Sequence, residues 1–250
     1  MDTKIGVCDS GLGGILVLKA LVNAYPNYDY IFIGDQINAP YGDLNPEQIY
    51  INACKIINYF ISININKVVI ACNTICANAI DKLRIKYPNI ILYDIIKPTI
   101  KQLDATNKNI LVMATNATIN THIYSKLINE YYPNIKVNEV ACPKLVPFIE
   151  QGAPNDWIQQ AVNLYLKDYV NTIDTVILGC THYPLIINQI YNCGDYKVLD
   201  SNNAIVKQIN LEKIDNEGSV KIYTTKDEEE MNEQSSLILN DEYKVNFIKL

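Results

Sequence analysis

Basic residues, histidines and long apolar runs are all scarce in this 250-residue chain. Lysine and arginine number 21 against 27 acidic residues, so the net charge is −6 and no basic cluster is available for a nucleic acid. Apolar stretches such as Ile90–Ile96 are far too short to cross a membrane. No signal-peptide pattern precedes the first predicted strand. We therefore expect a cytoplasmic protein with no nucleic-acid or membrane partner.

The seven cysteines are odd in number and irregularly spaced. Without a secretory signal, this arrangement argues against a disulfide framework. Cys72 and Cys76 lie four residues apart, but no second close pair and no nearby histidine completes a zinc-binding set. We expect neither disulfides nor a bound metal.

Short β-rich runs alternate with amphipathic stretches, which is typical of βαβ units and an α/β fold with a mainly parallel sheet. Helices are expected at Ile15–Asn23, Pro46–Ser62, Asn78–Lys86, Thr121–Glu130 and Trp157–Asp168. Strands are expected at Lys4–Cys8, Tyr30–Ile33, Lys67–Ala71, Ile90–Asp94, Asn109–Met113, Lys136–Ala141, Thr175–Gly179, Lys197–Leu199 and Val220–Tyr223. The run Asp227–Met231 is expected to be the solvated face of a helix.

One short phrase occurs twice. Val68–Thr74 and Val176–His182 both combine an apolar run, a small residue, a cysteine and then hydrogen-bonding residues. Each cysteine falls where a buried strand ends, and open α/β sheets bind ligands beyond the carboxyl ends of their strands. A helix N-terminus close to each cysteine is expected to lower the thiol pKa. Cys72 and Cys180 therefore indicate a single site with a sulfur on each side.

The repeated phrase also guides the division into domains, because no Pro/Gly/Ser-rich linker separates them. The crossover is expected near Lys97-Pro98, since proline disfavours helix in the residue before it. We expect residues 97–208 to form a second domain that carries Cys180. Residues 1–96 would form the first domain, completed by the C-terminal segment 209–250.

A glycine-rich turn, Asp9–Gly14, follows the first predicted strand. It matches neither the G-x-G-x-x-G nor the Walker pattern. Two interpretations stay open. The free N–H groups and the helix dipole could bind a substrate carboxylate or a phosphate, or the glycines could serve a tight turn with close helix packing.

Other cysteines and histidines are expected to be structural or inert. Cys54 lies on a predicted helix and Cys193 in a predicted loop, and His122 shows no link to a motif. His182 differs, because it follows Cys180 by two residues and can tune its protonation or relay a proton.

These phrases resemble the cofactor-independent aspartate/glutamate racemase family, and the first and last resemble its glutamate branch more than its aspartate branch. The resemblance departs at Asn38, where arginine is common, and at Lys97–Thr99, where Glu-Pro-Gly is common. The matching segments are Gly6–Gly14, Pro40–Gly42, Ala71–Thr74, Ala117–Thr118, Cys142–Pro143, Val146–Pro147, Glu150, Gly179–Leu185 and Asp200–Ser201.

The resemblance implies two open α/β domains facing each other across the site, no cofactor, and a possible homodimer. It implies that Cys72 and Cys180 are the catalytic acid/bases, assisted by Asp9, His182 and Glu150. The residues implied to hold the substrate are Asp9, Ser10, Pro40, Tyr41, Gly42, Asn73, Thr74, Thr115, Thr118, Thr181 and His182.

The implied activity is the interconversion of L- and D-glutamate, which supplies D-glutamate for peptidoglycan synthesis. Four alternatives stay open. They are a racemase for aspartate or another acidic amino acid, a cysteine-nucleophile hydrolase, a non-catalytic amino-acid-binding or regulatory protein, and a redox protein that uses both thiols. The hydrolase needs only one activated thiol and leaves the second cysteine phrase unexplained.

Overall fold

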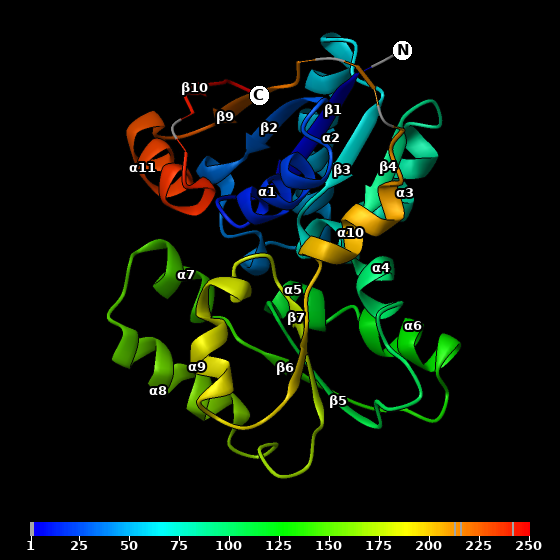
Figure 1. The fold of residues 1–250 in the computed structure, drawn as a ribbon, viewed down its shortest axis with the longest axis vertical. Helices are drawn as coiled ribbons and strands as arrows, with labels where there is room; N and C mark the ends of the chain where they lie inside the picture. Colours follow the sequence, from blue (N-terminus) through cyan, green and yellow to red (C-terminus); the bar gives the residue numbers. More distant parts are fainter. Residues whose placement is uncertain (1–2, 213, 216, 242) are drawn as a thin grey trace.

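The computed structural model describes residues 3–212, 214–215, 217–241 and 243–250. Residues 1–2, 213, 216 and 242 lie outside the described residues. The expectations for the chain start and for these positions of the predicted first domain therefore also lie outside them. The described chain forms two lobes, each built on its own sheet (Figure 1). All strand pairs in both sheets are parallel.

The first lobe carries a six-stranded sheet with the order β10-β9-β2-β1-β3-β4. Both chain ends lie in this lobe, because β9 and β10 return beside β2 after the chain has built the second lobe (Figure 1). The strands are β1 (Lys4–Asp9), β2 (Asp29–Gly34), β3 (Lys67–Ile70), β4 (Ile91–Asp94), β9 (Ser219–Thr224) and β10 (Val245–Phe247).

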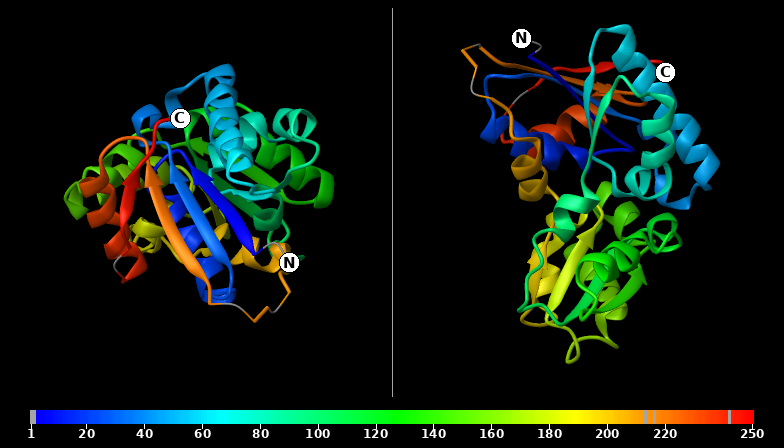
Figure 2. Two further views of the ribbon diagram at one scale, coloured as in Figure 1. Left: turned by 90° about the horizontal axis from the view of Figure 1, so that it is seen from above. Right: turned by 90° about the vertical axis from the view of Figure 1, so that its right-hand side faces the viewer.

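Helices cover both faces of the first sheet (Figure 2). On one face, α1 (Gly14–Ala24) packs against α10 (Asn202–Ile209) and α11 (Glu228–Leu239). On the other face, α2 (Pro46–Ser62) packs against α3 (Asn73–Lys86). None of the described helices has the length and apolarity needed to span a membrane.

The second lobe carries a four-stranded sheet with the order β6-β5-β7-β8. Its strands are β5 (Asn109–Ala114), β6 (Lys136–Ala141), β7 (Thr175–Gly179) and β8 (Lys197–Leu199). Its helices are α4 (Ile96–Ile100), α5 (Asn116–Ile119), α6 (Ile123–Tyr131), α7 (Leu145–Glu150), α8 (Asn155–Leu166) and α9 (Ile187–Tyr191). Short 3-10 turns complete the two lobes: η1 (Gln36–Asn38), η2 (Tyr41–Asp43) and η3 (Tyr183–Ile186).

Side chains of β5 alternate between two hydrophobic clusters, as the two-residue period of a strand requires. Leu111 and Met113 pack with α7, α8 and α9. Ile110 and Val112 belong instead to a cluster that continues into the first lobe. The two lobes therefore share one continuous apolar core on that side.

The predicted α/β class with parallel sheets is confirmed, and every predicted strand is present within a residue or two. The short strand β10 was missed, because three residues carry too little pattern. The predicted domain bounds at residues 97 and 209 stay a prediction. The helix α10, which lies within the predicted second domain, packs against both α1 and α4.

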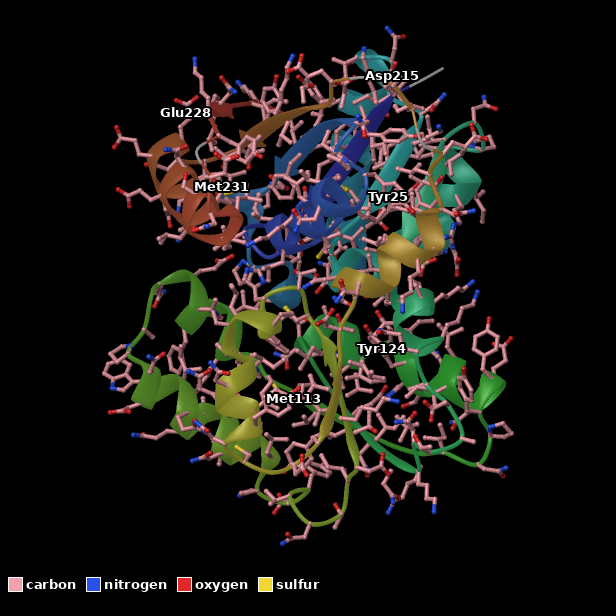
Figure 3. All side chains as sticks on the ribbon, viewed as in Figure 1. Tyr25, Met113, Tyr124, Asp215, Glu228 and Met231 are labelled. Atoms are coloured by element: carbon pink, nitrogen blue, oxygen red, sulfur yellow. The ribbon has the colours of Figure 1, made fainter. Side chains whose placement is uncertain are left out.

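Four local expectations were wrong. The helix expected over Asn78–Lys86 begins earlier, at Asn73. The helix predicted from Thr121 begins at Ile123, because His122 takes a left-handed φ of 53°. Lys97 is helical in α4 although it precedes Pro98, and the proline lies in the first turn, where its missing N–H costs no helical bond. Met231 is not solvated: it lies on α11 (Figure 3), and its side chain is fully buried against Gly34 at the end of β2.

We expect Phe60→Ala to destabilise the first lobe. Phe60 on α2 is fully buried, and its ring lies 3.0 Å from the position that a Cβ at Gly6 would take. Truncation of a buried phenylalanine costs about 3–5 kcal/mol of unfolding free energy. Urea denaturation measures this loss, with the exposed Ile85→Ala on α3 as the control that should change little. A loss for Phe60→Ala as small as that of the control would contradict the packing.

Candidate active site

The carboxyl ends of strands from both lobes meet at one pocket. Asp9 ends β1, Cys72 follows β3, and Cys180 follows β7. Because both sheets are parallel, each brings its strand ends to a single edge, and the two edges face each other. The residues that line the pocket are Ser10, Pro40, Tyr41, Gly42, Cys72, Asn73, Thr74, Thr115, Val146, Cys180, Thr181 and His182.

Most of the residues expected from the sequence line this pocket, and three stand directly behind the lining. Asp9 contacts Ser10 and Thr181, Thr118 contacts Thr74 and Thr115, and Glu150 contacts His182. Val146 was not expected among the site residues. Val146 belongs to the Val146–Pro147 motif that resembles the family, but nothing in the chemistry of its apolar side chain predicted a place in the site.

Asp9 is a fully buried carboxyl that joins the two lobes. Its Oδ1 accepts the Ser10 N–H at 2.7 Å, and its Oδ2 accepts the Gly14 N–H and, from the second lobe, the Thr181 hydroxyl at 3.2 Å. Burial raises the pKa of Asp9, and the charge of His182 opposes that shift. Asp9 therefore organises the turn that follows β1.

The glycine-rich turn serves close packing and binds a carboxylate of the protein itself. The Ser10 and Gly14 N–H groups, which one of the two open interpretations assigned to a ligand, donate to Asp9. A Cβ at Gly13 would collide with Thr181 and lie 2.7 Å from His182 Nδ1. Glycine is needed at this position because the second lobe approaches the backbone so closely.

Cys72 is a buried thiol, and its environment differs from the one expected. Its Sγ lies 3.6 Å from Ser10 Oγ, and the backbone N–H of Ile75 at the start of α3 acts to lower the pKa of the thiol. The helix N-terminus acts to lower the pKa of Cys72, as expected. Burial and then the charge of Asp9 outweigh it and raise the pKa well above the ordinary value. The expectation of a lowered pKa was therefore wrong for Cys72.

Cys180 has a different partner, an imidazole. His182 Nδ1 lies 3.7 Å from Cys180 Sγ, and His182 Nε2 lies 2.9 Å from Glu150 Oε1. Burial acts to lower the pKa of His182, but the hydrogen bonds with Cys180 and Glu150 raise it well above its ordinary value. Burial likewise acts to raise the pKa of Glu150, and the hydrogen bond with His182 lowers it. The pair is therefore an ion pair near neutral pH.

Threonine hydroxyls close the other side of the pocket and also cross between the lobes. Thr74 Oγ1 from the first lobe lies 2.9 Å from Thr115 Oγ1 and 3.3 Å from Thr118 Oγ1 in the second. Nearby, the Asn78 side-chain amide donates to the Ala117 carbonyl at 3.0 Å. The pocket is thus flanked on two sides by hydrogen bonds that join the lobes.

Tyr41 is held by a buried carboxylate in the loop after β2. Its hydroxyl donates to Asp35, which also accepts the Asn38 amide at 2.9 Å and the Thr225 hydroxyl at 2.8 Å. Asn38 stands where arginine is common in the resembling family, so here neutral donors surround Asp35.

Four backbone N–H groups face no protein acceptor at the two cysteine turns. They belong to Asn73 and Thr74, which begin α3, and to Thr181 and His182 after Cys180, and none has a hydrogen-bond partner among the described residues. Each cysteine is therefore followed by a pair of available donors. Within the described parts of the chain, no cluster of three His, Cys, Asp or Glu side chains forms a metal site.

The fold and pocket define an α/β protein in which two lobes each deliver a thiol and two N–H donors to one small site. Comparison with known proteins identifies the class. Residues 23–209 match the family model described as Asp/Glu/Hydantoin racemase. The chain belongs to this family and is an isomerase, a racemase.

Similar proteins share almost the whole chain. Glutamate racemase of Aquifex aeolicus (strain VF5) is 35% identical over 96% of this chain and 95% of its own length. Glutamate racemase 2 of Caldanaerobacter subterraneus subsp. tengcongensis is 37% identical over 99% of this chain and 98% of its own. The crystal structure of glutamate racemase from Francisella tularensis in complex with D-glutamate has a TM-score of 0.93 at 29% identity, covering 100% of this chain and 98% of that one. The resemblance inferred from the motifs is confirmed.

We expect Glu150→Gln to destabilise the protein in a pH-dependent way. Because the pKa of His182 is raised, the pair contributes stability that is fully present below the ordinary value of 6.5 and is lost as the pH rises through the folded value. The lowered pKa of Glu150 sets the acid side, so its contribution is lost below the ordinary value of 4.5, as the pH falls through the folded value. At pH 6 the variant should lose about 1.5–3 kcal/mol of unfolding free energy, typical of a hydrogen bond to a charged group.

Urea denaturation between pH 5 and 9 measures the difference between the wild type and this variant. Glu139→Gln is the matched control, because Glu139 pairs at 2.6 Å with His122, whose side chain is 64% exposed against 3% for His182. Exposed pairs contribute little. A loss for Glu150→Gln at pH 6 that is no larger than the loss for Glu139→Gln would contradict the ion pair.

Proposed function

We propose that this protein interconverts L- and D-glutamate without a cofactor, with Cys72 and Cys180 as its two acid/bases. One observation carries the proposal: two buried thiols, from equivalent strand ends of the two lobes, line the same pocket. Relatives named glutamate racemase, and the solved relative in complex with D-glutamate, support glutamate as the substrate.

Racemisation removes a proton from one face of Cα and delivers another to the opposite face. With the amino acid between the two sulfurs, the thiolate of one cysteine takes the Cα proton, and the electron pair of that C–H bond moves toward the carboxylate. The thiol of the other cysteine then gives its proton to the opposite face of the carbon. After one turnover the two cysteines have exchanged their protonation states, so the reverse reaction uses the same groups in exchanged roles.

Each cysteine has its own helper for this proton exchange. Asp9 contacts Cys72, and His182 contacts Cys180 with Glu150 behind it. The raised pKa of Cys72 favours its thiol form at rest, and the adjacent Asp9 carboxylate can accept that proton when Cys72 must act as the base. The imidazole of His182 can donate to a Cys180 thiolate or accept from its thiol.

The weak acidity of the Cα–H is the main chemical obstacle. Negative charge grows on the substrate α-carboxylate as the proton leaves. The free N–H groups of Asn73, Thr74, Thr181 and His182 are suited to that carboxylate, and each donor of this kind is typically worth about 2.7–4 kcal/mol. Tyr41, Gly42 and the threonine hydroxyls of the opposite wall are left for the substrate side chain.

The product D-glutamate would serve peptidoglycan synthesis, as the family resemblance implies. Residues 97–208 and the rest of the chain would act as two domains that close over the amino acid. Closure excludes water and strengthens the hydrogen bonds inside the pocket.

Proton NMR in deuterium oxide tests the reaction directly. We expect loss of the Cα–H signal from both D- and L-glutamate with no added cofactor, together with the opposite enantiomer by chiral chromatography. Aspartate in the same assay tests the alternative substrate. Folded protein that neither exchanges nor inverts either amino acid would exclude this function and favour a binding or regulatory role.

Cys72→Ser and Cys180→Ser test the two acid/bases. Each should lower racemisation in both directions by roughly 10²–10⁴-fold, the range for loss of a general acid/base. Cys54→Ser and Cys193→Ser are matched controls, because these cysteines lie outside the pocket and should keep wild-type rates. Full racemisation by either pocket variant would contradict the two-cysteine mechanism.

A further inference from the structure

Tyr124 on α6 makes a hydrogen bond across the boundary between the lobes. Its hydroxyl donates to Asn73 Oδ1 at 2.6 Å, and the two residues are only 1% and 2% exposed. Tyr124 lies in the second lobe near the junction (Figure 3), whereas Asn73 begins α3 in the first lobe. Burial raises the pKa of Tyr124 well above its ordinary value, so the phenol keeps the proton that it donates.

The Asn73 amide is left with one unused end. Its Nδ2 is buried and has no hydrogen-bond partner in the part of the chain that the structure describes. This nitrogen carries two N–H donors and cannot accept. Buried donors are almost always satisfied, and Asn73 lines the pocket between Cys72 and Thr74. An acceptor bound in the pocket would satisfy this nitrogen.

The orientation of the amide decides which ligand group it can bind. With Oδ1 turned to Tyr124, the amide offers a donor to the pocket, which suits a carboxylate. A flipped amide would offer an acceptor, which suits an ammonium group. The flip would also leave the Tyr124 proton without an acceptor, since Asn73 is the hydrogen-bond partner of this hydroxyl among the described residues.

We propose that Tyr124 is a positioning residue that holds the Asn73 amide with Nδ2 toward the α-carboxylate of the substrate. This inference rests on the proposed function, which sets the substrate Cα beside Cys72. Because Asn73 directly follows Cys72, the carboxylate within its reach is the one attached to the reacting carbon. That carboxylate gains charge in the transition state, so the Nδ2 hydrogen bond strengthens there and acts on kcat more than on KM.

Steady-state kinetics on a four-variant cycle test the inference. Tyr124→Phe removes only the hydroxyl and should lower kcat roughly 10–100-fold, as misplacement of a reacting group does, with a smaller change in KM. Asn73→Ala should cause a similar loss, and the double variant should be no slower than Asn73→Ala alone. Tyr30→Phe is the matched control, because this buried hydroxyl bonds only to backbone carbonyls in the first lobe and its loss should leave the rate unchanged.

A wild-type kcat in Tyr124→Phe would overturn the inference, and so would a loss that adds in full to that of Asn73→Ala. The rate of the wild type itself tests the proposed function and is read separately. Should aspartate prove to be the substrate, the same cycle applies to it without change.

A second measurement does not depend on turnover. In protein labelled with ¹⁵N-asparagine, the side-chain signals of Asn73 are identified by their loss in Asn73→Ala. We expect Tyr124→Phe to shift these signals or average them by rotation of the amide, and Tyr30→Phe to leave them in place. Unchanged Asn73 signals in Tyr124→Phe would overturn the inference even in an active racemase. Shifted signals in a protein inactive on both amino acids would remove the proposed function, and would show only that Tyr124 fixes the orientation of the Asn73 amide.

Discussion

The buried Asp9 carboxyl is the interaction on which the site depends. A carboxyl removed from water must be satisfied by hydrogen bonds, and Asp9 collects them from its own turn and from Thr181 in the other lobe. The same carboxyl accepts hydrogen bonds from the glycine-rich turn, and its charge raises the pKa of the Cys72 thiol. The charge of His182 in turn acts to lower the pKa of Asp9. Asp9 therefore ties the packing of the lobes to the protonation of the site.

Hydrogen bonds between the lobes surround the pocket. Asp9 and Thr181 form one, Thr74 and Thr115 a second, and Asn73 and Tyr124 a third. Each joins a residue at the start of a turn or helix in one lobe to a residue of the other, so movement of the lobes must change the donors and acceptors that a ligand meets. The proposed racemase gains two unlike acid/bases from this arrangement, one backed by a carboxyl and one by an imidazole.

Much of the site could be predicted from the sequence, because parallel strands bring their carboxyl ends to one edge. The residues after β1, β3 and β7 follow from that rule once the strands are recognised. Tyr124 could not be found in this way: it lies within a helix, and its partner Asn73 is 51 residues away. Val146 was missed as a lining residue for a related reason. An apolar side chain in a sequence indicates packing in the core and does not indicate a binding or catalytic role.

By itself, the sequence determined the α/β class, the two cysteine turns and the family. The reason is that apolar residues repeat every two positions in strands and every three to four in helices, and that the motifs are short and continuous. Only the tertiary structure decided which groups are charged and which donors are free. The pKa of Cys72 is raised where a helix N-terminus alone predicts a lowered one, since burial and Asp9 outweigh the local dipole. The Ser10 and Gly14 amides of the glycine-rich turn donate to Asp9, whereas those after Cys72 and Cys180 are available. Desolvation and hydrogen-bond partners depend on residues distant in the chain, and they exist only once the two lobes have packed together.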